Sequence, residues 1–442
     1  MSIHMRTKHA KNDTKVIKTD TVSVKNVKNQ YGFVLPILTS LLHTPRGASA
    51  KAVLWITWPP KARQTAPKMC FPENENATYV KNSSKFQVPS FKFSSGFRVP
   101  GSGFKGTCHA IMWGAMDKTG LKAIAAAGLL LTDSCPARCR HCYVSAGPDQ
   151  SRWMSVEDAA RHLAALVRLG VAGEGIHIGG GEPFGDFDRL LAVVRAAREV
   201  GLGGIAYVET SGFWAASDDL VQRRLAALAE AGMKQLSISA DPYHQEFVPP
   251  DRVRRLLGTA RAVLGPQGVR ARRWKWLENP RDVAAMPETE RLDLFREFLK
   301  KYPERMTGRA AERLAALADR RPVEDLPDAP CRAIFQSRHV HVDPEGWIWP
   351  GTCAGIALGR ATPERPLDEC LRDWRPEMNS ALAILAEGGP KRLLDLAARS
   401  GFQADPQGYA GPCHLCWMVR KHLVGRGAGG ETLRPACVYL TS

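Results

Sequence analysis

Three cysteines stand close together in the chain, at Cys135, Cys139 and Cys142. Iron–sulfur clusters are normally held by four cysteine thiolates. Three thiolates on one short loop can therefore hold three irons of a cubane cluster and leave the fourth iron without a protein ligand. A structural zinc site is the alternative, because cysteine pairs and triplets also close zinc sites. The spacing of three residues and then two is not that of a paired zinc knuckle, and it favours the iron–sulfur cluster.

A second motif follows about forty residues later, in the run Gly179-Gly180-Gly181-Glu182. Short apolar segments at residues 128–131 and 175–178 precede the two motifs and predict buried strands. Folds of the α/β class place their chemistry on the loops that follow such strands. Glycines permit a positive φ and a close approach to a ligand, and the Glu182 carboxylate suits an ammonium group. A simple tight turn is the alternative for the glycines.

The two motifs together resemble those of the radical S-adenosylmethionine (radical SAM) superfamily. The resemblance rests on the CxxxCxxC motif at Cys135–Cys142 and on the GGEP-type strand end at Gly180–Pro183, and it spans about residues 121–277. It implies that the three cysteines bind a [4Fe–4S] cluster whose open iron is chelated by SAM. Reductive cleavage of SAM then gives a 5′-deoxyadenosyl radical that abstracts hydrogen from a substrate. The resemblance further places Gly180, Gly181 and Glu182 at the methionine amino group and His141 near the adenine, with Gly179 as a further cofactor-binding candidate.

The surrounding segments alternate between helix and strand patterns. Helices are predicted at residues 155–169, 186–200 and 217–231, and strands at 204–209 and 235–239. Such alternation indicates βαβ units and a parallel sheet with functional loops at the carboxyl ends of the strands. With the resemblance, it predicts an α/β fold: a partial (β/α)6 TIM-like barrel with a small cysteine-rich C-terminal domain.

Polar residues follow two of the predicted strands and are candidates for contacts with SAM or the substrate: Glu209, Ser211, Ser239 and Asp241. Helix caps and turn formation are the alternative roles for each of them. A fifth strand at residues 269–277 carries four basic side chains. Alternation would point some of these into the barrel, and exposed edge charges are the alternative.

The C-terminal third holds a second set of cysteines around a predicted hairpin of residues 338–342 and 347–350. Such thiols in a reducing compartment favour a metal over disulfides. The arrangement resembles the SPASM and twitch extensions of radical SAM enzymes, which carry auxiliary four-iron clusters, although the dense cysteine segment of a full SPASM domain is missing. We expect one auxiliary [4Fe–4S] cluster, with zinc as the alternative. Its expected ligands are Cys331, Cys353, Cys413 and Cys416, with Cys437 able to replace one of them and Cys370 a buried thiol.

Charge and composition divide the chain at about residue 120. Residues 1–120 contain 18 Lys and Arg against 5 Asp and Glu, and the remainder of the chain is nearly balanced at 43 against 39. Lysine dominates the first part and arginine the second. We therefore expect a basic, disordered extension over residues 1–120, a radical SAM barrel over 121–325 and an auxiliary-cluster domain over 326–442. The extension could be foreign to an enzyme that begins near Met112 or Met116.

Other readings of the extension are weaker. The apolar residues 31–42 loosely resemble a signal peptide, but the preceding segment is too long and Pro36 interrupts them. The lysines are spread out with few aromatic partners, which argues against a nucleic-acid-binding tail. No stretch has the roughly 18–20 apolar residues needed to span a bilayer. A reduced cluster that cleaves SAM also places the enzyme in the cytoplasm.

The sequence thus predicts a radical SAM enzyme that modifies a peptide or protein, because enzymes with this type of extension often do so. Biosynthesis of a small molecule or cofactor is the second enzymatic hypothesis. A zinc-stabilised binding protein is the non-enzymatic one. An electron donor such as flavodoxin or ferredoxin is the expected partner. The sequence assigns no general acid or base.

Overall fold

The computed structural model describes the strand backbones at residues 22–28, 34–40, 54–56, 80–82 and 85–88, and then residues 121, 123–372, 374–377 and 380–440. The chain divides into two compact units, Met1–Asp117 and Lys118–Ser442. In the first unit, β1 (Val22–Lys28) pairs antiparallel with β2 (Val34–Ser40). Strand β5 (Lys85–Val88) pairs antiparallel with β3 (Leu54–Ile56) and with β4 (Val80–Asn82). Apart from these strands, which the sequence pattern did not indicate, the predicted disordered extension lies outside the described residues.

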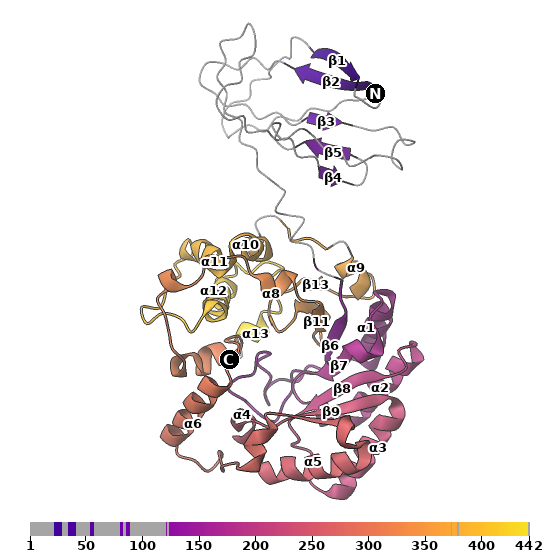
Figure 1. Cartoon of the computed structure of the whole chain (residues 1–442), viewed down its shortest axis with the longest axis vertical. Helices are drawn as coiled ribbons and strands as arrows, with labels where there is room; N and C mark the ends of the chain where they lie inside the picture. The colour runs from indigo at the N-terminus through magenta and orange to yellow at the C-terminus, as the bar shows by residue number, and fades with distance from the viewer. Residues whose placement is uncertain are drawn as a thin grey trace. The chain divides into compact units, whose positions relative to one another are not determined.

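An eight-stranded sheet organises the second unit, in the order β10-β9-β8-β7-β6-β11-β12-β13 (Figure 1). All neighbours from β10 to β11 run parallel, and β12 and β13 continue the sheet antiparallel. The sheet is open, with β10 and β13 at its edges, which confirms the predicted α/β class and partial barrel. The strands are β6 (Ala126–Leu130), β7 (Ile176–Gly179), β8 (Ile205–Thr210), β9 (Met233–Ser239), β10 (Val269–Arg272), β11 (His339–Val342), β12 (Trp347–Pro350) and β13 (Gly359–Arg360).

Helices α1 (Val156–Arg168), α2 (Phe187–Glu199), α3 (Asp218–Ala231) and α5 (Pro250–Leu264) connect the parallel strands and pack against one another in this order (Figure 1). The first three begin where the sequence indicates, because Ser155, Asp186 and Ser217 cap them with side-chain oxygens. The remaining helices are α4 (Pro242–Gln245), α6 (Glu288–Lys301), α7 (Arg309–Arg313), α8 (Arg332–Phe335), α9 (Leu367–Leu371), α10 (Ala381–Glu387), α11 (Gly389–Ala398), α12 (Pro412–Gly425) and α13 (Cys437–Leu440).

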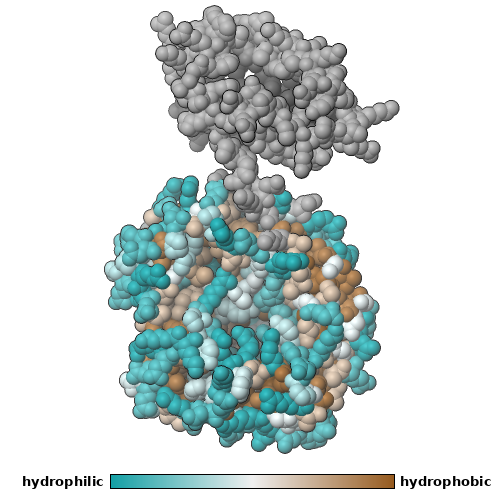
Figure 2. Space-filling view, viewed as in Figure 1, coloured by the Kyte–Doolittle hydropathy of each residue, from teal (hydrophilic) through white to brown (hydrophobic). Residues whose placement is uncertain are grey.

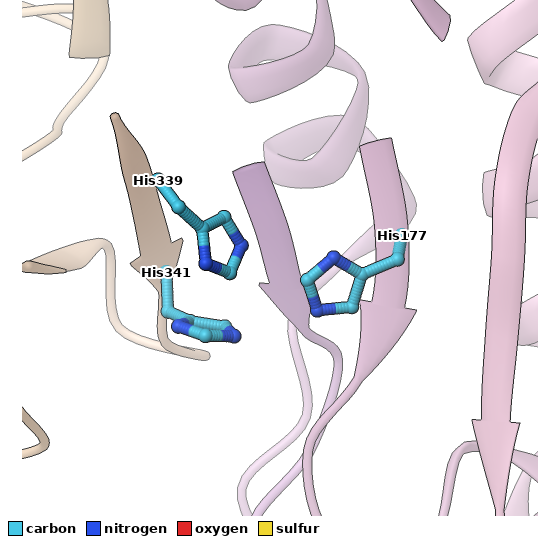
Figure 3. A group of neighbouring side chains, drawn as sticks. All are labelled: His177, His339 and His341. Atoms are coloured by element: carbon cyan, nitrogen blue, oxygen red, sulfur yellow. The ribbon is translucent and has the colours of Figure 1, made fainter. Parts of the chain in front are cut away.

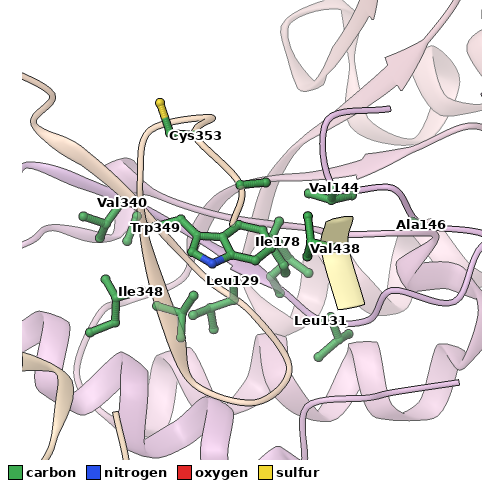
Figure 4. Packing of buried hydrophobic residues seen from close by; sticks show 14 of the residues in the cluster. Leu129, Leu131, Val144, Ala146, Ile178, Val340, Ile348, Trp349, Cys353 and Val438 are labelled. Carbon is green, nitrogen blue, oxygen red and sulfur yellow. The ribbon is translucent and has the colours of Figure 1, made fainter. Parts of the chain in front are cut away.

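The sixth parallel strand is contributed by the C-terminal third of the chain. Strand β11 pairs in parallel with β6, with His341 opposite Gly128. Side chains of the hairpin, including Ile348 and Trp349, pack in the same core as Leu129, which lies in β6, and Leu131, which follows it (Figure 4). Full burial of one such side chain contributes about 1.5–3 kcal/mol. The domain boundary predicted after residue 325 therefore crosses one continuous sheet and one core.

The surface of this unit is mostly hydrophilic on the face drawn in Figure 2, with hydrophobic residues scattered among the polar ones. Among the described residues the exposed large hydrophobic side chains are Val167, Phe247, Trp274 and Leu440. None of the described helices combines the length and the apolar character that a membrane span requires.

Candidate functional site

The loop that carries Cys135, Cys139 and Cys142 follows β6 and lines a cavity of about 400 Å³. Its backbone is held by short-range hydrogen bonds: the Cys142 N–H donates to the Cys139 carbonyl at 3.1 Å, and the Cys135 N–H donates to the Gly147 carbonyl at 3.1 Å. All three sulfurs belong to side chains in the cavity wall. Burial, with a smaller contribution from Glu182, raises the pKa of Cys135 to about 12. Binding of a metal at the Cys135 thiol would therefore release its proton.

The glycine run lies directly against the segment that leads into this loop. The Gly181 N–H donates to the Thr132 carbonyl at 2.6 Å, and the Glu182 N–H donates to the Ser134 carbonyl at 2.9 Å. A Cβ on Gly180 or Gly181 would overlap these carbonyl oxygens, and Gly180 also has φ +127°. The glycines are therefore required by the approach of two backbones. Gly180 and Gly181 line the cavity as well, whereas Gly179 packs against the Glu209 carboxylate.

The Glu182 side chain is 1% exposed and is not part of the cavity wall. Its carboxylate accepts hydrogen bonds from the Thr210 hydroxyl at 2.9 Å, from the Ser211 N–H at 2.8 Å and hydroxyl at 2.5 Å, and from the Phe184 N–H at 3.3 Å. These four donors match the acceptor capacity of a carboxylate. Glu182 therefore fixes the end of β8 against the glycine run. The contact with an ammonium group that the sequence suggested stays a prediction.

Of the four polar residues predicted at the strand ends, Glu209, Ser211 and Ser239 line the cavity. Burial raises the pKa of the Glu209 carboxyl, and Arg272 of β10 lies 3.7 Å from it. Arg272 is one of the four basic side chains of the fifth predicted strand, some of which alternation would point into the barrel, and it lines the cavity. That strand ends at Arg272 rather than at residue 277, because Arg273 has a positive φ of 61°.

Asp241 is not in the cavity wall, and its carboxylate instead lies between two histidines, His141 and His244. It caps α4, and its carboxylate lies 2.8 Å from Nδ1 of His244 and 3.8 Å from Nε2 of His141. Burial alone would lower the pKa of His244, but Asp241 raises it above its usual value. His141 stacks on Tyr243, with 4.8 Å between ring centroids, and lines the cavity. Burial lowers the pKa of His141 to about 3, and its Nδ1 has no partner among the described residues.

Arg309 is a site residue that sequence reasoning missed. Its side chain is 4% exposed and lies in the cavity wall. Nε donates to the Cys139 carbonyl at 3.0 Å, Nη2 donates to the Ala146 carbonyl, and the backbone N–H donates to the Cys142 carbonyl at 3.0 Å. Its Nη1 is buried and unpartnered within the described residues. The preceding Gly308 has φ +59° and lies against the backbone of Cys142 and Tyr143, and this Gly-Arg pair is the only local signal.

The second set of cysteines converges on a separate cavity of about 140 Å³. Its wall contains Cys331, Cys353, Cys413 and Cys416, which come from three distant parts of the chain. Two arginines accompany them: Arg305 hydrogen-bonds to Cys413, and the fully buried Arg420 hydrogen-bonds to Cys416. Arg305 and Thr307 line both cavities and so form the partition between them.

The two remaining described cysteines lie elsewhere. Cys437 is not in the wall of the second cavity, and its charged neighbours are Arg152, Glu345, Asp343 and Asp133. Cys370 is 2% exposed, and its thiol donates to the carbonyls of Arg360 and Arg365 at 3.4 and 3.6 Å. Cys370 is thus a buried thiol, as expected.

Part of the chain is similar to a known protein family. Residues 129–264 match the family model of the Radical SAM superfamily. No curated protein matches the chain.

Several solved structures resemble the fold. BtrN in complex with AdoMet and 2-DOIA is 14% identical, with a TM-score of 0.36, and the match covers 62% of this chain and 91% of that one. Streptococcus suis SuiB bound to the precursor peptide SuiA is 11% identical, with a TM-score of 0.29 and coverage of 73% and 77%. Native anSMEcpe with bound AdoMet and Cp18Cys peptide is 11% identical, with a TM-score of 0.35 and coverage of 69% and 98%. Likeness at this level carries no argument about the substrate.

Proposed function

We propose that this chain, which has a radical SAM domain in residues 129–264, reductively cleaves SAM and uses the radical to abstract hydrogen from a peptide or protein. SAM cleavage, the first half of the proposal, is supported by the residues of the cavity wall. Cys135, Cys139 and Cys142 share it with the glycine strand end at Gly180 and Gly181.

The residues present fit a [4Fe–4S] cluster and SAM. The three cysteines would hold the cluster, and the unpartnered buried Nη1 of Arg309 offers a positive charge beside a negatively charged group. When bound, the cluster supplies the electron for cleavage of the SAM sulfonium, chemistry that belongs to the cofactor. The buried Nδ1 of His141 has no hydrogen-bond partner among the described residues, and bound SAM could supply one.

The chain's own task is to orient SAM and to exclude water. Gly180 and Gly181 let the cofactor approach the backbone, and Ser211 and Ser239 present polar groups in the same wall. We propose that Glu209 and Arg272 face the charged methionine part of SAM, since both line the cavity and lie 3.7 Å apart. Glu182 and Asp241 act as positioning residues through Ser211 and His141.

Incubation of anaerobically reconstituted enzyme with SAM and dithionite tests the proposal. We expect brown protein and formation of 5′-deoxyadenosine, both lost in the triple variant C135A/C139A/C142A. C370A is the matched control, because that thiol lies outside both cavities, and it should keep the activity. The mechanism is refuted if the wild type forms no 5′-deoxyadenosine or the triple variant forms as much.

We further propose an auxiliary [4Fe–4S] cluster in the second cavity, as in SPASM and twitch extensions, which the C-terminal cysteines resemble. Four cysteines would give a closed ligand set, and Arg305 and Arg420 would balance its negative charge. Zinc on the same four thiolates is the alternative. Iron analysis decides between them: two [4Fe–4S] clusters give about eight irons per chain, and one cluster plus zinc gives about four irons and one zinc. The variant C331A/C416A should lose only the iron or zinc of the second cavity and keep the four irons of the first cluster.

The peptide substrate is supported by the resemblance of the C-terminal cysteines to extensions that are common in peptide-modifying enzymes. Biosynthesis of a small molecule remains the competing proposal, favoured by a cavity of only about 400 Å³. A short Cys- or Gly-rich open reading frame beside the gene would supply a test peptide. A mass change in that peptide with SAM supports the first proposal. Stimulation of 5′-deoxyadenosine formation only by a peptide-free extract supports the second. A flavodoxin or ferredoxin in the cytoplasm would supply the electron in the cell.

A further inference from the structure

Three histidines form a compact cluster in the wall of the large cavity that the proposed function leaves without a role. His177 lies on β7, and His339 and His341 lie two residues apart on β11, so their side chains share one face of the sheet. Figure 3 shows the three rings directed toward one another across the strand between them. One ring nitrogen from each residue can be chosen so that all three lie within 4.8 Å of one another.

The strand between them is shaped to let these rings meet. On β6, Gly128 is the register partner of both His177 and His341. A Cβ at Gly128 would lie 2.5 Å from Nε2 of His177 and 2.5 Å from Cδ2 of His341. Any other residue would therefore push the two imidazoles apart. Glycine is unfavourable in the interior of a strand, and here it stands at the position where the two rings approach each other.

The hydrogen bonds in the cluster fix the tautomer of the His341 ring. Nδ1 of His341 lies 2.5 Å from the Gly351 carbonyl oxygen and must donate to it, so Nε2 carries the lone pair. The Tyr143 hydroxyl lies 3.3 Å from that Nε2 and is the hydrogen-bond partner that a metal ion would displace. Within the described part of the chain, the rings of His177 and His339 make no hydrogen bond. A backbone carbonyl that fixes the tautomer of a histidine is the usual support of a metal ligand.

A role in packing explains these features less well. His177 stacks on Tyr207 with 4.7 Å between ring centroids, which phenylalanine or tyrosine would also do, but neither would bring a ring nitrogen to the cavity wall. Burial lowers the pKa of all three imidazoles, so each is neutral and able to bind a metal. The other cluster of this kind, His141, Asp241 and His244, already has its internal contacts and belongs to the site described above.

We propose that His177, His339 and His341 bind one divalent first-row transition metal ion, of the Zn²⁺ type, in the wall of the cavity that also holds the cysteine loop. Three neutral imidazoles suit such ions, and a tetrahedral ion about 2.0–2.1 Å from each nitrogen draws the three nitrogens to about 3.3 Å apart. The fourth position faces the cavity, because all three residues line it. The ion keeps its double charge there and can coordinate an oxygen of a bound molecule.

The test uses the full chain after reconstitution with iron and sulfide, with Zn²⁺ added and excess removed by gel filtration. We expect one zinc per chain beyond the iron, and an X-ray absorption spectrum at the zinc edge with nitrogen or oxygen neighbours at about 2.0 Å and no sulfur at about 2.3 Å. H177A and H339A should weaken zinc binding by at least about 100-fold, since even outer partners of metal ligands cost 10–100-fold. The iron content should stay unchanged.

A variant that removes no ligand guards against misfolding as the cause. G128A adds a methyl group between His177 and His341 and should lower zinc affinity, whereas G258A on α5, where a Cβ meets nothing within 4 Å, should not. Zinc bound through sulfur, no zinc in the wild type, or equal zinc affinity in the histidine variants would each overturn the proposal. Zinc content does not depend on SAM cleavage, so failure of the proposed function and failure of this inference are told apart.

Discussion

At the scale of single residues, the cysteine loop is held by a guanidinium that is distant in the sequence but adjacent in space: Arg309 lies 170 residues after Cys139. Its side chain and backbone donate to the carbonyls of Cys139, Cys142 and Ala146. Because buried carbonyls need donors, the geometry of the three sulfurs depends on this side chain. Its positive charge also lies beside the three thiols.

The 170 residues between Cys139 and Arg309 are a separation in sequence only. In space, Nε of Arg309 lies 3.0 Å from the Cys139 carbonyl oxygen.

Replacement of Arg309 tests this dependence. R309K keeps the charge but cannot reach two carbonyls with a planar fork, and each buried carbonyl left without a donor costs about 1–3 kcal/mol. We expect R309K to retain less iron than the wild type when challenged with a chelator after reconstitution. R313K, an exposed arginine at the end of the same helix α7, is the control and should behave as the wild type. Equal iron retention in R309K would contradict the role assigned to Arg309.

At the scale of elements, the end of β7 and the segment after β6 fit together only through glycine. Gly181 donates to the Thr132 carbonyl at 2.6 Å, and a Cβ on it would overlap the Ser134 carbonyl oxygen. Ser134 immediately precedes Cys135, so any shift there moves the first cysteine. The two sequence motifs are thus parts of one structural unit.

G181A should therefore displace the cysteine loop and lower both the iron content and the yield of 5′-deoxyadenosine. The matched control is G258A, because this glycine lies within α5 with open space around its Cα. Alanine is favoured over glycine within a helix by roughly 0.5–1 kcal/mol, so G258A should keep its iron and melt no earlier than the wild type. A G181A protein with full iron content would rule out the proposed coupling of the two motifs.

Helix α1 carries a buried titratable group that makes stability depend on pH. His162 is 6% exposed, and burial lowers its pKa to about 4. In the unfolded chain the imidazole binds a proton below about pH 6.5. The unfolded state then holds more protons between pH 6.5 and 4, so the stability present above pH 6.5 is lost as the pH falls toward 4.

H162Q and H162L remove this titration. Whatever their melting temperatures at pH 7.5, the melting temperature of both variants should fall less between pH 7.5 and pH 5 than that of the wild type. Thermal melts of the three proteins across this range provide the measurement. A fall as steep in both variants as in the wild type would show that other groups set the pH dependence.

At the scale of the molecule, the C-terminal third completes the barrel as well as bringing the second set of cysteines. Strand β11 pairs with β6, and the Trp349 side chain is 2% exposed in a core shared with Leu129 (Figure 4). Arg305 and Thr307 line both cavities and so connect the two sites within one unit. The unit Lys118–Ser442 should therefore fold as a whole.

Two truncations test this. A chain of residues 116–442 should be monodisperse and keep the iron content and SAM cleavage of the full chain. A chain of residues 116–325 exposes the edge of β6 and should aggregate or lose its cluster. Size-exclusion chromatography and iron analysis decide, and a soluble, cluster-bearing 116–325 chain would contradict the prediction. Peptides from residues 1–100 in the native protein would speak against a foreign N-terminal extension.

The sequence alone determined the features that arise from neighbouring residues. The helices α1 to α3, their caps at Ser155, Asp186 and Ser217, and the cysteine and glycine motifs are local patterns, and periodicity and spacing are enough to reveal them. Only the tertiary structure decided which distant residues meet. Arg309 reaches the cysteine loop, and β11 brings His339 and His341 to His177 across Gly128. No local pattern encodes these contacts, because they are set by strand order and by packing in one shared core.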